Sequence, residues 1–312
     1  MAFPVVSVAM TSYNSASQLR RSFDSILAQI TEFPIEIVLG DDCSNDMTIE
    51  IARSYQQKYP RVVTILARPK NIGIQRNYYD TFENCRGKYI AWLDADDCWT
   101  DRQKLAIQVK VLESDPSVSI CCHCVRRVTD KGDVVQGRYP RIPAGRYGVS
   151  QIIDHNFVPS PSIMFRNGLH RNLPPWYFEL HNMSDWPLLI LGALSGDILL
   201  LDEVMADYTL SSGSSFEAKG ELFREKIVVQ LLERADSILP PELHRAVHSN
   251  AGKHYEAVAY LLRTQGEYSA SRAAAWKAFS LPALGDNLAS KTKALSAALI
   301  HETKYKIGKR RQ

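Results

Sequence analysis

The first 100 residues alternate short apolar runs with amphipathic stretches, and this alternation restricts the possible folds more than any other feature of the chain. Residues 5–10 form a continuous apolar run with one serine, which is typical of a strand covered on both faces. Leu19, Phe23 and Ile26 then recur at helical spacing within residues 15–29. Strands and helices that alternate through short connections predict a parallel α/β sheet. The expected strands are 5–10, 35–39, 62–66 and 88–93, and the expected helices are 15–29, 47–58 and 74–85.

Polar clusters follow three of the expected strands at the points where the strands end. They are residues 11–14, 41–42 and 94–97. Aspartate and asparagine also tolerate turn geometry, which is the alternative explanation for any one of these clusters. Ligands of open α/β sheets bind beyond the carboxyl ends of the strands, so three clusters on one edge of a sheet favour a ligand site.

The chain changes character along its length. Residues 115–215 mix short expected strands at 118–122 and 198–201 with proline-rich loops. Beyond residue 216 the pattern is helical, with expected helices at 222–238, 243–263, 269–278 and 288–299. We therefore expect an α/β domain over 1–216 and a helical C-terminal region over 217–312 that ends in a basic tail.

The composition is that of an ordinary globular protein rather than a disordered or fibrous one, with 45% hydrophobic and 23% charged residues. A formal charge of +3 without a basic stripe gives no reason to expect a nucleic-acid partner. The apolar runs are far shorter than the ~20 residues that span a bilayer, and no cationic and apolar leader opens the chain. Six cysteines in 312 residues do not suggest a disulfide framework, so we expect a cytoplasmic protein with reduced thiols.

One cysteine-rich segment, Cys121-Cys122-His123-Cys124, invites comparison with a zinc site. Structural zinc usually takes ligands from separated Cys-x-x-Cys pairs, whereas neighbouring cysteines on a strand face opposite ways. We therefore expect buried thiols here.

The cluster at 94–97 is the strongest candidate for a metal site. Asp94-Ala95-Asp96-Asp97 follows the apolar run at 89–93 directly. Mg²⁺ and similar hard cations take one or two carboxylates together with phosphate oxygens of a substrate. Alternate residues at a strand end point the same way, so Asp94 and Asp96 can reach one ion, with Asp97 as a third candidate ligand.

Four motifs in order resemble those of family 2 glycosyltransferases, which are inverting enzymes of the GT-A fold that use nucleotide-diphosphate sugars. The resemblance covers roughly residues 4–215 and implies a mixed, mainly parallel sheet flanked by helices. Its motifs are residues 6–14, residues 41–46, Asn71-Ile72-Gly73 with Arg76-Asn77, and residues 87–97.

The resemblance implies that the first strand–helix loop, with Thr11, Tyr13 and Asn14, grips the nucleotide. The Tyr13 ring would stack on the base, although a core aromatic is the alternative. Asp42 would accept a hydrogen bond from the N–H of the base, which favours a UDP- or dTDP-sugar, because an ionised carboxylate only accepts. Asp41 would brace the loop.

The resemblance also assigns roles around the diphosphate. Arg76 would pair with diphosphate oxygens, with an exposed helix charge as the alternative. Asp94 and Ala95 would contact the nucleotide sugar. Asp96, with Asp94 and Asp97, would bind Mn²⁺ or Mg²⁺.

The catalytic base of the family lies about ninety residues beyond the metal motif, at the start of a helix, and Asp185 matches that place. In a single displacement this carboxylate removes the proton of the acceptor hydroxyl, while the metal offsets charge on the departing diphosphate. Ser184 is expected to cap the helix. The alternative is that Asp185 only stabilises the first helical turn, an effect of about 0.3–1 kcal/mol.

We therefore expect a metal-dependent inverting glycosyltransferase that acts on a hydroxyl of a glycan, in the synthesis of surface polysaccharide or lipopolysaccharide. The segment after Tyr208, residues 209–215, lacks the arginine and histidine that many relatives carry, so a nucleotide-sugar-binding module without catalysis is one alternative. A haloacid-dehalogenase-like phosphotransferase, which also uses Asp-x-Asp, is another. The basic residues between 304 and 311 suggest peripheral contact with the inner face of a membrane.

Overall fold

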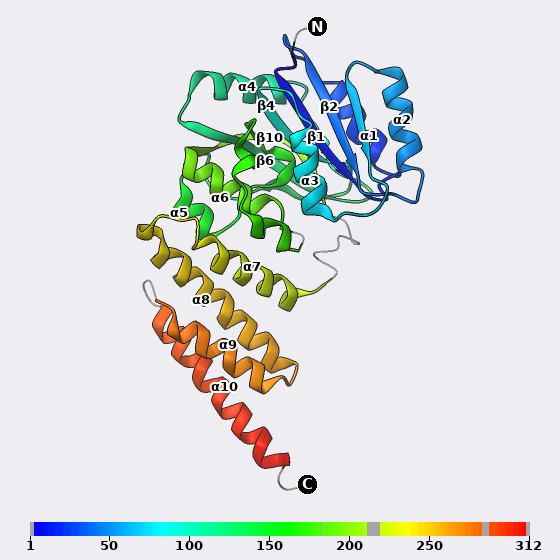
Figure 1. The fold of residues 1–312 in the computed structure, drawn as a ribbon. Helices are drawn as coiled ribbons and strands as arrows, with labels where there is room; N and C mark the ends of the chain where they lie inside the picture. The colour runs from blue at the N-terminus through cyan, green and yellow to red at the C-terminus, as the bar shows by residue number, and fades with distance from the viewer. Residues whose placement is uncertain (1–2, 182, 211–218, 283–286, 310–312) are drawn as a thin grey trace. The chain divides into compact units, whose positions relative to one another are not determined.

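A computed structural model describes residues 3–181, 183–210, 219–282 and 287–309, the last nine of these by their backbone (Figure 1). The residues group into two compact units that divide near residue 212, and residues 153–155 group with the second unit. Each unit has its own hydrophobic core. The predicted boundary between residues 216 and 217 lies outside the described residues.

The first unit is built on a ten-stranded sheet whose main path has the order β3-β2-β1-β4-β9-β6-β10-β5, with β7 paired to β6 and β8 to β10. Strands β1 to β4 are parallel, and so are β6 and β10, whereas β9 lies antiparallel between β4 and β6. The strands are β1 Val6–Ser12, β2 Ile35–Asp41, β3 Val63–Ala67, β4 Tyr89–Asp94, β5 Cys98–Trp99, β6 Val118–Thr129, β7 Val134–Tyr139, β8 Gly145–Tyr147, β9 Met164–Arg166 and β10 Asp197–Leu210.

The helices of this unit pack their apolar faces on the sheet. Helix α1 buries Leu19, Phe23 and Ile26, as their spacing predicts. Gly40 lets α3 approach β2 closely, because a Cβ there would lie 2.1 Å from the Thr81 hydroxyl oxygen. The helices are α1 Leu19–Leu27, α2 Thr48–Lys58, α3 Ile74–Glu83, α4 Lys104–Ser114, α5 Val149–Asp154 and α6 Asp185–Ser195, with short 3₁₀ helices η1 Ser160–Ser162, η2 Leu169–Asn172 and η3 Pro175–Glu179.

The register of the parallel strands aligns their polar ends. Thr11 at the end of β1 pairs with Gly40 on one side and with Asp94 on the other. Ser12 pairs with Asp41. The prediction that the three polar clusters share one edge of the sheet is therefore confirmed.

The structure extends the sheet beyond the sequence prediction. The expected strands at 118–122 and 198–201 are only the first parts of β6 and β10. Strand β10 changes register between Leu201 and Val204, so its apolar alternation is interrupted. Strands β5, β7 and β8 and helices α4 and α5 were not predicted, because they are short or have no clear period.

The second unit is helical, as expected. Its helices are α7 Glu221–Ala235, α8 Pro241–Thr264, α9 Tyr268–Ser280 and α10 Asn287–Lys309. Its core is formed by Val229, Val258, Ala259, Leu262, Ala274, Ala275 and Ala298. Within the described residues, no helix combines the length and apolarity needed to cross a membrane.

Candidate active site

Asp94, at the end of β4, is held by donors from four elements or loops. Its Oδ1 accepts hydrogen bonds from the Thr11 hydroxyl at 3.0 Å and the Trp92 indole N–H at 3.4 Å, and also from the Tyr78 hydroxyl. Its Oδ2 accepts from the Ser160 hydroxyl at 3.3 Å. Burial raises the pKa of Asp94, and these donors oppose the shift. The Asp94 carboxylate is therefore fixed in orientation at the edge of the sheet where the three polar clusters meet.

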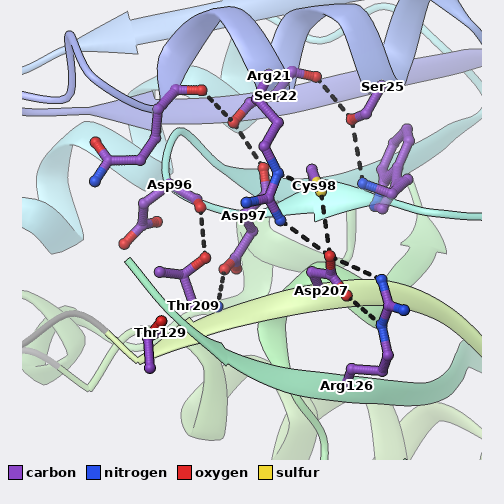
Figure 2. A network of polar contacts seen from close by, with 12 residues as sticks. Arg21, Ser22, Ser25, Asp96, Asp97, Cys98, Arg126, Thr129, Asp207 and Thr209 are labelled. Carbon is purple, nitrogen blue, oxygen red and sulfur yellow. Dashed lines mark hydrogen bonds and ion pairs between the residues drawn. The ribbon is translucent and has the colours of Figure 1, made fainter. Parts of the chain in front are cut away.

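Asp96 and Asp97 differ in exposure. Asp97 is buried, and its Oδ1 accepts the backbone N–H of Thr209 at 2.7 Å (Figure 2). Burial, followed by the charges of Asp96 and Asp94, raises the pKa of Asp97 well above its usual range. Asp96 is only partly buried, and its backbone carbonyl accepts the Thr209 hydroxyl at 2.7 Å.

This turn fits a divalent cation through few protein ligands. Within the part of the chain that the structure describes, no three His, Cys, Asp or Glu side chains are grouped to enclose a metal. Asp97 Oδ2 is buried and accepts no hydrogen bond from the described residues, so the turn contains an acceptor oxygen without a partner among them. One or two carboxylates, completed by substrate oxygens, suit Mg²⁺ or Mn²⁺. Asp94, Asp96 and Asp97 are the carboxylates of this turn that could supply them.

The first strand–helix loop is an open, hydrogen-bonded turn. Asn14 has a positive φ of 51°, and its Oδ1 accepts the Asn45 amide at 2.9 Å. The Asn14 amide donates to the Ser44 hydroxyl at 2.9 Å. The Tyr13 side chain is 53% exposed, so the alternative that it is a core aromatic is wrong.

Asp41, the last residue of β2, and Asp42, which follows it, hold different loops. Asp41 accepts the Ser12 hydroxyl and the Ser44 amide, each at 2.9 Å, so the expectation that it braces the loop is confirmed. Asp42 accepts the backbone N–H groups of Ile72 at 2.7 Å and Gly73 at 3.1 Å, just before α3. Each carboxylate oxygen can accept more than one donor, so Asp42 keeps capacity for a ligand N–H.

Three further polar residues lie near the start of α3. The Arg76 guanidinium is exposed and lies 3.9 Å from the centre of the Phe178 ring. Sequence reasoning missed Arg68 and Gln75, whose Nη2 and Nε2 atoms are buried donors without a partner among the described residues. Arg68 directly follows β3, so the rule that ligands bind beyond strand ends could have identified it.

Asp185 begins α6 and is also fixed by hydrogen bonds. Its Oδ2 accepts the Asn156 side-chain amide at 3.0 Å, and its Oδ1 accepts the Trp186 backbone N–H at 2.8 Å. Ser184 makes no capping hydrogen bond, so that prediction is wrong: the carboxylate of Asp185 occupies the nearby amide instead. Burial raises the pKa of Asp185, and the Asn156 hydrogen bond opposes the shift.

One segment links Asp185 with the metal motif. Asn156 donates to Asp185, and Ser160, four residues along, donates to Asp94. The Cα atoms of Asn156 and Ser160 are at most about 14 Å apart, so one short segment contacts both carboxylates. The same four carboxylates also act on one phenol. Burial, and then the charges of Asp97, Asp185, Asp94 and Asp96, raise the pKa of Tyr208.

The remaining predictions fall outside this site. The thiols of Cys121, Cys122 and Cys124 are buried and free, as expected. His123 is buried beside them, and burial lowers its pKa to about 3. The serine-rich segment 211–215 and the side chains of the basic tail lie outside the described residues.

Known proteins resemble the chain in sequence. An uncharacterized protein of Mycobacterium tuberculosis is 33% identical over 205 residues, which cover 65% of this chain and 58% of that protein. A putative teichuronic acid biosynthesis glycosyltransferase of Bacillus subtilis, TuaG, is 33% identical over 110 residues, covering 35% of this chain and 42% of that protein. The chain thus spans less than two thirds of the length of these relatives.

Solved structures share the fold. A crystal structure of S. aureus TarS 1-349 in complex with UDP has a TM-score of 0.56 at 19% identity, covering 94% of this chain and 90% of that one. The mannosyltransferase PcManGT from Pyrobaculum calidifontis, in complex with GDP-Man and Mn²⁺, has a TM-score of 0.61 at 19% identity, covering 97% and 83%. The family model for glycosyl transferase family 2 matches residues 7–173, more than half of the chain. The chain has the GT-A fold and belongs to glycosyl transferase family 2.

Proposed function

We propose that the protein transfers a sugar, with inversion, from a UDP- or dTDP-sugar to a hydroxyl of a glycan, and that transfer requires Mn²⁺ or Mg²⁺. The observation that carries the proposal is the segment from Asn156 to Ser160, whose side chains hydrogen-bond to Asp185 at one end and to Asp94 at the other. A single displacement needs a base near the acceptor hydroxyl and groups that stabilise the charge of the leaving diphosphate. The segment from Asn156 to Ser160 connects the residues proposed for these two roles.

In the proposed mechanism, Asp185 removes the proton of the attacking hydroxyl. Its Oδ2 is oriented by Asn156, and its Oδ1 is held by the backbone of α6. Asp94 and Asp96 hold the diphosphate side of the donor. A divalent cation bound there would offset the charge of the departing diphosphate. PcManGT, whose structure contains GDP-Man and Mn²⁺, supports the choice of ion class.

The donor base is proposed to be uracil or thymine. These bases present an N–H between two carbonyl oxygens. Asp42 is an acceptor bonded to the segment just before α3, and two buried donors without a partner among the described residues, Arg68 Nη2 and Gln75 Nε2, belong to residues that flank this segment in the sequence. Guanine presents two donors beside one acceptor on its pairing edge and fits this set less well. The structure of TarS with UDP supports the same choice.

We extend the proposal to the acceptor and the location. A surface polysaccharide or a lipid-linked glycan would agree with the name of TuaG. A cytoplasmic enzyme touching the inner face of the membrane through its basic tail would reach such an acceptor, since each basic residue near an anionic surface contributes about 1 kcal/mol.

The test is metal-dependent turnover of a panel of UDP-, dTDP- and GDP-sugars, followed as release of nucleoside diphosphate. Turnover of a UDP- or dTDP-sugar that stops when EDTA removes the metal supports the proposal. A protein that bound nucleotide sugars but neither transferred the sugar to any acceptor nor hydrolysed the donor would instead support a binding module without catalysis. The dehalogenase-like alternative is wrong, since the chain belongs to a glycosyltransferase family.

Asp42→Asn is expected to weaken UDP binding tenfold or more, because a hydrogen bond to a charged acceptor contributes about 1.5–3 kcal/mol. Isothermal titration with UDP measures the loss. Asp133→Asn, which changes an exposed carboxylate in the β6–β7 turn, is the matched control. Unchanged UDP affinity in Asp42→Asn would contradict the assignment of Asp42 to the base.

Asn156→Ala is expected to move the acid limb of the kcat–pH profile to higher pH. Asp185 acts as a base only when ionised, so activity falls as the pH falls through its raised pKa. Asn156 lowers that pKa by donating to the carboxylate, and its removal raises the pKa further. Asn84→Ala, at an exposed asparagine after α3, serves as the control, and an unmoved acid limb in Asn156→Ala would argue against Asp185 as the base.

A further inference from the structure

The turn after β4 is held through its backbone by two hydroxyl groups from distant parts of the sequence. The Ser22 hydroxyl of α1 lies 2.7 Å from the Ala95 carbonyl and 2.6 Å from the Asp97 carbonyl. The Thr209 hydroxyl of β10 donates to the Asp96 carbonyl at 2.7 Å (Figure 2). Three consecutive carbonyl groups of the proposed metal turn are therefore contacted by side chains.

The two hydroxyl groups do not constrain the turn equally. A hydroxyl carries one proton, and Ser22 also lies 3.4 Å from the Gln18 carbonyl of its own helix, so its one bond is divided among three carbonyls. Thr209 makes two separate bonds to neighbouring residues, because its hydroxyl serves the Asp96 carbonyl and its amide serves the Asp97 carboxylate at 2.7 Å. Thr209 thus holds the carbonyl of the Asp96–Asp97 peptide bond and the side chain of Asp97.

Thr209 is itself held in a rigid place. Asp207 lies two residues earlier on β10 and so projects to the same face of the strand. Its carboxylate accepts Arg21 of α1 at 3.0 Å and Arg126 of β6 at 2.6 Å (Figure 2). Asp207 also pairs with Cys98 of β5, which directly follows the turn. Strand β10 is therefore braced against α1, β5 and β6 where it meets the turn.

We propose that Thr209 is a positioning residue for the metal-binding carboxylate of Asp96. The inference rests on the proposed function, in which Asp96 ligates the divalent cation. A carboxylate ligand presents its oxygens reproducibly only when its backbone is fixed, and partners that orient a ligand typically contribute tenfold to hundredfold to metal affinity. The hydroxyl of Thr209 acts on the backbone of Asp96 and does not itself contact the metal or the substrate.

The test compares Thr209→Val, which keeps the shape and the amide but removes the hydroxyl, with Thr209→Ser, which keeps the hydroxyl. Mn²⁺ binding in the presence of UDP is followed by the electron paramagnetic resonance signal of free Mn²⁺. Thr209→Val should weaken Mn²⁺ binding about tenfold and leave metal-free UDP binding unchanged. Thr209→Ser should stay within about twofold of the unaltered protein. Thr129→Val is the matched control, since Thr129 lies on the adjacent strand and its hydroxyl accepts from Asp133.

Each outcome bears on the proposal. Mn²⁺ affinity in Thr209→Val equal to that of the unaltered protein would overturn the role of Thr209 and leave the proposed function standing. Equal losses in Thr209→Val and Thr209→Ser would also overturn it, because the hydroxyl would then not be the active group. An unaltered protein that binds no Mn²⁺ with UDP would overturn the metal assignment and the role of Thr209 together. A melting curve of Thr209→Val separates loss of folding from loss of metal.

Discussion

Asp185→Asn is expected to lower kcat by a factor of about 10²–10⁴, the usual contribution of a positioned general base. Asparagine keeps the size of the side chain and an acceptor for the Trp186 amide, so α6 should begin at the same place. Nucleotide-sugar binding should change little, because the residues proposed to hold the nucleotide lie at or just after the ends of β1, β2 and β4 and on α3. Steady-state transfer rates and donor titrations, measured side by side, separate the two effects.

The control for this substitution is Asp197→Asn, which changes a partly exposed aspartate at the start of β10 that pairs with Arg146. It should leave kcat within about twofold. If Asp185→Asn retained full activity, the carboxylate would only stabilise the first turn of α6, an effect of about 0.3–1 kcal/mol on folding and none on chemistry.

Asp96→Ala is expected to reduce the Mn²⁺-dependent part of donor binding at least a hundredfold. Removing an outer partner of a metal ligand typically costs tenfold to hundredfold, and removing a ligand itself costs more. Calorimetric titration of UDP with and without Mn²⁺ measures this directly. The metal-free affinity should be retained, because Asp42 and the loop at Tyr13 are untouched.

Asp101→Ala is a suitable comparison, because Asp101 is a nearby aspartate outside the turn. Identical Mn²⁺ dependence in Asp96→Ala and the unaltered protein would show that the cation is held elsewhere, and Asp94 would become the first ligand to test. Both predictions concern carboxylates, but they act on different steps, so a double substitution should lose transfer and metal dependence together.

The parallel part of the fold could be predicted from the sequence because three of its four strands, β1, β2 and β4, are covered on both faces. Such strands appear as uninterrupted apolar runs, and the first of them, β1, is buried along its whole length. The polar residues that follow, among them Thr11 and Asp94, then align through the register of the strands. The rule that residues at the carboxyl ends of parallel strands share one edge of the sheet therefore predicts where the proposed donor would bind, without knowledge of any side-chain contact.

The acceptor side could not be predicted in the same way. Strand β9 has only three residues, and β10 has register shifts near Val204, so neither shows a regular period. The roles of Asn156 and Thr209 depend on contacts with residues 29 and 113 positions away. Only tertiary packing brings such groups together, whereas Asp185 could be identified because a family pattern marks it.

The short antiparallel strand β9 connects two parts of the sheet. It joins the parallel strands β1 to β4 to the mixed part that contains β6 and β10 through three residues, Met164–Arg166. Thr11, Asp42 and Asp94 belong to the part before this strand, whereas Asp185 and Thr209 come from the chain after it. The spacing between these two groups of residues therefore depends on the pairing of β9 with β4 on one side and β6 on the other.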